Sequence, residues 1–134
     1  MNRKRFEWLV AQAIEALPEE FITRLENIVV VVEDYPTNAQ LAKTGVKRSH
    51  TLLGLYEGVP LTKRGIHYNI VPPDKITIFQ KSIESECRDD AEITAEIQRV
   101  AQHEIAHHFG IDDVRLRQIE RAKLKRKGNV SQLN

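Results

Sequence analysis

The chain has few of the features on which secreted or membrane-bound proteins depend. Cys87 is the only cysteine, which excludes a disulfide within the chain and fits a reducing compartment. No run of apolar residues approaches the ~20 needed to span a bilayer. The N-terminus is basic, but Glu7, Gln12 and Glu15 interrupt the segment that follows, which therefore lacks the apolar core of a signal peptide. We expect a cytoplasmic protein that does not bind a membrane.

Aromatic residues and net charge are low as well. Aromatic side chains make up 6% of the 134 residues, and the formal net charge of +1 gives no overall attraction to nucleic acid or to an anionic surface. Hydrophobic residues nevertheless reach 41%, and a chain of this length buries roughly two-thirds of its unfolded surface. We expect one domain over residues 1–134, with residues 128–134 as a flexible tail.

Helical patterns occur at both ends of the chain. Apolar residues recur at helical spacing over residues 6–17, and Pro18 ends this segment and opens a second short helix. A long helix is expected after Asp89, a suitable N-cap, with Glu92 completing a capping box. A last helix is expected from about residue 114 to 125. The long helix has one apolar stripe, formed by Ile93, Ile97, Val100, Ala101 and Ile105.

The strand signals lie between these helices. The β-branched run at residues 28–32 predicts a buried strand. Residues 75–80 alternate polar and apolar side chains, which predicts a strand near a sheet edge; within it, residues 76–79 either pair with an extended peptide or lie inside the sheet. Weaker strands are expected at 51–56 and 66–70, and residues 37–50 are expected to form an exposed loop. We therefore predict an α+β fold in which a small mixed sheet packs against the long helix, with helices flanking it at both ends.

Residues 103–107 (HEIAH) suggest a metal site near the end of the long helix. His103 and His107 are four positions apart, so both imidazoles project from one helix face and can bind the same ion. Glu104 is placed to take a proton from a water molecule that the ion activates. This spacing is typical of zinc hydrolases, most of them metalloproteases.

A catalytic zinc ion usually has three protein ligands and one position left for water. Gly110 follows His107 by three residues and allows the chain to leave the helix through a left-handed turn. Asp113, three residues further on, can then complete a His-His-Asp site. We assign Asp112 to the cap of the last helix, and Glu120 is a weaker candidate for the third ligand.

The same residues also have a purely structural interpretation. A five-residue pattern with three fixed positions arises by chance in many proteins. A surface helix followed by two capping aspartates, without any metal, would have the same sequence pattern. A structural metal site normally has four protein ligands and favours cysteine, and no fourth ligand is evident. The helical context, Gly110 and Asp113 together favour a catalytic zinc site.

Two other residues have open roles. His108 either points to solvent, packs on the sheet or orients a substrate. Tyr56 either stabilises an oxyanion or is a half-buried strand residue. His50 and His67 are more typical of loop and strand positions than of a metal site.

Several longer motifs resemble one protein family. Residues 103–113 (HEIAHHFGIDD) are similar to the signature of the minimal zincin-like metallopeptidases of bacteria, as are residues 52–62 with Arg64, and residues 73–79. The resemblance extends roughly from the first helix to the last. It implies a compact zincin-like fold with a core like that of matrix metalloproteases. Met1 is the only methionine, so the methionine turn of the larger metzincins is absent.

The resemblance implies a role for each motif residue. Zn²⁺ would be held by His103, His107 and Asp113, with Glu104 as the general base of peptide-bond hydrolysis. A peptide or protein would be the substrate.

Two other functions are weighed against this one. The first is a metal-dependent hydrolase of a substrate such as RNA. A candidate nucleic-acid surface is the basic C-terminal helix, although its late positive charges also suit the C-terminal end of a helix. Its basic residues are Arg115, Arg117, Arg121, Lys123, Lys125, Arg126 and Lys127. Glu104 favours peptide chemistry, because RNA-processing metalloproteins with three histidines at this spacing lack the adjacent glutamate. The second is a catalytically weak zincin fold that binds or regulates a partner. The sequence sets no oligomeric state.

Overall fold

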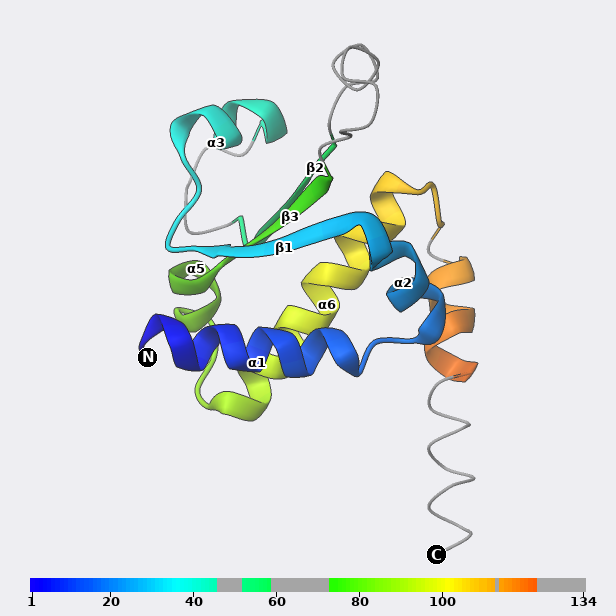
Figure 1. Cartoon of the computed structure of the whole chain (residues 1–134), viewed down its shortest axis with the longest axis horizontal. Helices are drawn as coiled ribbons and strands as arrows, with labels where there is room; N and C mark the ends of the chain where they lie inside the picture. The colour runs from blue at the N-terminus through cyan, green and yellow to red at the C-terminus, as the bar shows by residue number, and fades with distance from the viewer. Residues whose placement is uncertain (46–51, 59–72, 113, 123–134) are drawn as a thin grey trace, which may run out of the picture.

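The computed structural model describes residues 1–45, 52–58, 73–112 and 114–122 (Figure 1). The elements along the chain are α1 (Arg3–Glu15), α2 (Glu19–Arg24), a short 3-10 helix (Leu25–Asn27), β1 (Ile28–Glu33), α3 (Asn38–Thr44), β2 (Gly54–Glu57), β3 (Asp74–Phe79), α5 (Gln80–Glu84) and α6 (Asp90–His108). Residues 114–122 are also helical. The predicted first, second, long and last helices are confirmed, and so is the α+β fold class. Among the described residues, no helix is both long and apolar enough to cross a membrane.

The strands form a mixed sheet in the order β1-β3-β2, with β1 parallel and β2 antiparallel to β3. The prediction that residues 75–80 form a strand near the sheet edge is wrong, because β3 is the central strand. The alternation of polar and apolar residues misled this interpretation: Thr77 is as fully buried as Ile76 and Ile78 on the opposite face. A small side chain with a hydroxyl group can therefore be buried, so a threonine in a strand does not show that its face of the sheet is exposed to solvent.

The strand at β1 is correctly located, but the prediction that it is buried is wrong. Within the described sheet β1 lies at an edge, and Val29 is 42% exposed. A run of β-branched residues reports the preference of the backbone for an extended conformation, and it does not report how much of the strand is covered.

The prediction of a loop over residues 37–50 is wrong for residues 38–44, which form helix α3, whereas residues 46–50 lie outside the described residues. Thr37 is its N-cap: its side chain accepts a hydrogen bond from the Gln40 backbone, and the Gln40 side chain accepts one from the Thr37 backbone. This reciprocal capping box starts the helix even without a strong apolar pattern. Gly45, with φ +74°, ends it. The expected strand at 66–70 and the expected tail at 128–134 lie outside the described residues.

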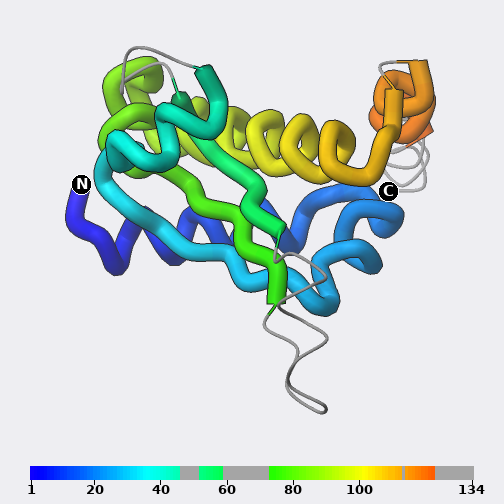
Figure 2. The backbone as a smooth tube through the Cα atoms, turned by 90° about the horizontal axis from the view of Figure 1, so that it is seen from above, coloured from blue at the N-terminus to red at the C-terminus, as the bar shows by residue number. Residues whose placement is uncertain are grey.

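The sheet lies between helices on its two sides. Figure 1 shows α3 above the strands and α1 and α6 below them, and Figure 2 shows the same layers from above. The main core is on the side of α1 and α6, where fully buried apolar side chains each contribute about 1.5–3 kcal/mol of burial free energy. Its largest fully buried members include Phe6, Phe21, Ile76, Ile78, Ile97 and Ile105.

Gly54 allows β2 to approach α6 closely. A Cβ atom at this position would collide with Cγ1 of Val100 on α6 and would lie 3.2 Å from the Thr77 carbonyl oxygen. We expect Gly54→Ala to lower the free energy of unfolding by about 1–3 kcal/mol through overpacking. Urea titrations of the double variant Gly54→Ala/Val100→Ala test this contact. Its loss of unfolding free energy should be smaller than the sum of the losses in the two single variants, by about 1 kcal/mol or more. Strict additivity would show that the two residues do not press on each other.

Candidate metal centre

Helix α6 carries the candidate metal-binding residues in its last two turns. It starts at the predicted N-cap, where the Asp89 side chain accepts from the Glu92 backbone N–H at 2.9 Å. The Glu92 carboxylate accepts in return from the Arg88 backbone at 2.6 Å, one residue before the N-cap. The predicted apolar stripe is buried along its whole length. Because this stripe fixes the rotation of the helix against the sheet, it also fixes the direction in which the polar residues of the last turns project.

The structure brings His103, Glu104 and His107 to one cavity of about 330 Å³, next to Ala106 and Leu116. Both histidines are exposed, so their ring nitrogens are accessible to an ion from solution. Glu104, which lies beside them on the helix surface, is half-buried. Imidazole nitrogens are donors that suit Zn²⁺, and the two histidines supply two of the three protein ligands that a catalytic site usually has.

Glu104 is held against the edge of β2. Burial raises the pKa of Glu104 above its ordinary value, whereas the backbone N–H of Tyr56, which donates a hydrogen bond to the carboxylate, and the nearby His107 act in the opposite direction. The close approach of β2 to α6 at Gly54 brings Tyr56 within reach of this carboxylate. Strand β2 thus orients the side chain of Glu104, to which the sequence analysis assigns the role of general base.

A second cavity lies on the α3 side of Glu104. It encloses about 450 Å³ and shares Glu104 and His107 with the first cavity. Lys43 and Thr44 of α3 line it, together with Leu55 of β2. The missed helix α3 therefore forms one wall of the site, and the shared residues lie between two depressions of the surface. An extended chain crossing both would pass directly over Glu104.

The end of α6 follows the predicted course. Gly110 has φ +71°, and the backbone N–H groups of Gly110 and Ile111 donate to His107 and Ala106 at 3.4 and 2.8 Å. These paired bonds close the helix through the left-handed turn that glycine favours. Asp112 caps the next helix, since its side chain accepts from the Arg115 backbone at 2.8 Å. The predicted roles of Gly110 and Asp112 are confirmed.

Asp113, the predicted third ligand, lies outside the described residues. In the part of the chain that the structure describes, no three histidine, cysteine or acidic side chains gather as a metal site. Glu120, the weaker candidate, is described and exposed, and it belongs to no such group. The described geometry therefore supplies two imidazoles and a neighbouring carboxylate, and the third ligand stays a prediction.

Three side chains beside the site form a cluster that the sequence did not predict. The His108 ring stacks on the Tyr56 ring with centroids 3.8 Å apart and an interplanar angle of 19°. The Tyr56 hydroxyl donates to Asp74 at 2.6 Å, and Nε2 of His108 lies 3.9 Å from the same carboxylate oxygen. Of the roles weighed for His108, packing on the sheet is the one observed. Tyr56 is half-buried, and its hydroxyl is engaged by Asp74.

Comparison with known proteins identifies a family. A family model described as zincin-like metallopeptidase matches residues 25–123, which run from the end of α2 through α6 to the last described helix. The match includes every residue of the candidate site. A comparison with curated proteins found no match.

Proposed function

Since the chain belongs to the zincin-like metallopeptidase family, we propose that it is a zinc-dependent peptidase with Glu104 as general base. The observation that carries this proposal is the position of Glu104, which is half-buried, bonded to the Tyr56 backbone and shared by two surface cavities. We propose that His103, His107 and Asp113 hold the zinc ion. Zinc bound there supplies Lewis acidity, which acidifies water and polarises a substrate carbonyl.

The chain's own residues account for the proton transfers. A carboxylate has two oxygens, and the Tyr56 N–H engages the group without occupying all of its acceptor capacity. Glu104 can thus accept a proton from the attacking water and pass it to the departing amine nitrogen. The hydrogen bond limits rotation of the side chain, which keeps the carboxylate aimed at the cavities on either side.

The proposed test is cleavage of an unfolded protein by the purified chain. We expect fragments in mass spectrometry with the zinc-loaded protein, no fragments after a chelator has removed the metal, and renewed cleavage when zinc is restored. The heat-denatured zinc-loaded protein serves as the matched control. Cleavage that persists unchanged after complete metal removal would contradict the proposal, because Glu104 alone cannot activate water strongly enough.

The alternatives from the sequence predict other outcomes of the same assay. A hydrolase of RNA would cut an added RNA and leave the protein intact, and a binding protein would cut neither. In the described part of the basic last helix, Arg115 is ion-paired with Glu20 at 2.9 Å, which lowers the positive charge available to RNA at that position. We propose a cytoplasmic location, which the single cysteine, Cys87, supports because the chain cannot form an internal disulfide. Burial raises the pKa of the half-buried Cys87 thiol, and nearby Glu96 and Glu92 raise it further.

A further inference from the structure

A groove lies between α1 and β1, and none of its lining residues belongs to the candidate metal centre. This α1–β1 groove encloses about 540 Å³, within the range of ~300–1,000 Å³ typical of binding sites. None of the residues that line it lines the cavities beside Glu104. We propose that the groove binds an extended basic segment of a partner protein, which pairs with β1 as an additional strand.

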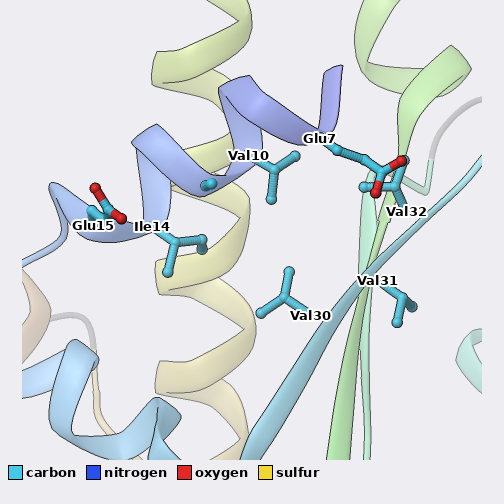
Figure 3. Close-up of a pocket in the computed structure, with 8 residues that line it drawn as sticks. Glu7, Val10, Ile14, Glu15, Val30, Val31 and Val32 are labelled. Carbon is cyan, nitrogen blue, oxygen red and sulfur yellow. The ribbon is translucent and has the colours of Figure 1, made fainter. Parts of the chain in front are cut away.

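The groove has an apolar floor and acidic ends. Figure 3 shows Val10 and Ile14 of α1 pointing toward Val30 of β1, with Glu7 next to Val32 at one end and Glu15 at the other. Val30 and Ile14 are only partly buried, so apolar surface remains to be covered. The occupant must therefore supply apolar side chains between two positive charges.

The outer edge of β1 offers backbone groups to such a segment. The Val32 carbonyl accepts from the Arg3 guanidinium at 2.7 Å, which places this carbonyl on the side away from β3. Because alternate residues of a strand direct their backbone groups the same way, the amide and carbonyl of Val30 face outward too. Within the described chain, β1 pairs with β3 alone. The run from Ile28 to Val32 has no proline or charge of the kind that normally blocks pairing at a sheet edge.

The acidic ends determine the charge of the occupant. Glu7 and Glu15 are exposed, and neither forms an ion pair with any residue that the structure describes. Arg3, at the start of α1, is engaged by Asp34 and Gln80. A second copy of the chain is a poor occupant, because pairing two β1 strands would bring these acidic ends together with Glu33.

Spacing along α1 sharpens the prediction. Glu7 and Glu15 are eight positions apart, which corresponds to about 12 Å along a helix. An extended chain covers this distance in about four residues. Side chains four positions apart in a strand lie on the same face. The segment is therefore expected to carry lysine or arginine about four positions apart with an apolar residue between them.

A labelled peptide tests the proposal by fluorescence anisotropy. The probe is a peptide of about nine residues in which valine alternates with threonine and two lysines stand about four positions apart. We expect it to bind the wild-type chain, and the double variant Glu7→Lys/Glu15→Lys to bind it about ten-fold or more weakly. The matched control, Glu19→Lys/Glu26→Lys, changes the net charge equally at exposed positions outside the groove and should bind as the wild type does.

Other outcomes overturn the proposal. If both double variants bound the peptide equally weakly, the change in net charge alone would explain the loss of affinity. Undiminished binding of a peptide with a central proline would exclude strand pairing, and no binding at about 1 mM would exclude the site altogether. Sedimentation that shows a dimer, broken by Val29→Lys on the exposed face of β1, would assign the groove to a second copy of the chain.

Discussion

Glu104→Gln is expected to lower kcat for peptide cleavage by about 10²–10⁴-fold while leaving zinc bound. Glutamine keeps the size of the side chain and can still accept the hydrogen bond from the Tyr56 backbone, but it cannot take a proton from water. The expected loss is that of a single general base. Cleavage reactions that are stopped at successive times and analysed by mass spectrometry give the rate. Elemental analysis of the same sample gives the amount of bound zinc.

Glu96→Gln is the matched control for this change. Glu96 lies two turns earlier on α6, where its carboxylate pairs with Arg99 and lines neither cavity beside Glu104. Its replacement should leave kcat unchanged and cost at most about 1 kcal/mol of stability. If Glu104→Gln cleaves as fast as the wild type, Glu104 is not the base. If neither protein cleaves while both hold zinc, the chain is better described as a binding protein with a zincin fold.

The parts of this molecule that could be predicted from sequence are those with local causes. Asp89 caps α6 through a bond to a residue three positions away. At its end, Gly110 bonds to a residue three positions back, and Ile111 bonds to a residue five positions back. The apolar stripe between them requires only helical periodicity. The direction in which His103 and His107 project follows from the same periodicity, so this part of the site was predictable together with the helix that carries it.

The predictions that failed concern features that depend on contacts between segments distant in the sequence. The central position of β3 depends on which strands pair on either side, and the exposure of β1 depends on the absence of a neighbour among the described residues. The stack of His108 on Tyr56 joins residues more than fifty positions apart. Helix α3 is the exception, because its capping box is local. Thr37 and Gln40 carried the signal, and the polar character of the surrounding residues obscured it.

His103→Ala is expected to reduce bound zinc from about one ion per chain to less than about one-tenth. Two remaining ligands cannot close the coordination sphere of a catalytic site that normally has three. His103 is exposed and lies outside the buried stripe of α6, so the apo fold should survive its removal. Elemental analysis of the purified proteins measures the loss directly.

The stability of the folded chain gives a second, independent readout of the same loss. Zinc that binds only the native state stabilises it by about 2.7 kcal/mol at one hundred times its Kd, so added zinc should raise the Tm of the wild type and not that of His103→Ala. His108→Ala is the comparison variant, because it removes a neighbouring exposed imidazole that stacks on Tyr56 and lines the cavity on the α3 side, but not the cavity shared by His103 and His107. This variant should keep both its zinc and its zinc-dependent shift. Equal zinc loss in both variants would mean that His108 is needed as well, and the ion would then be bound differently from the arrangement proposed.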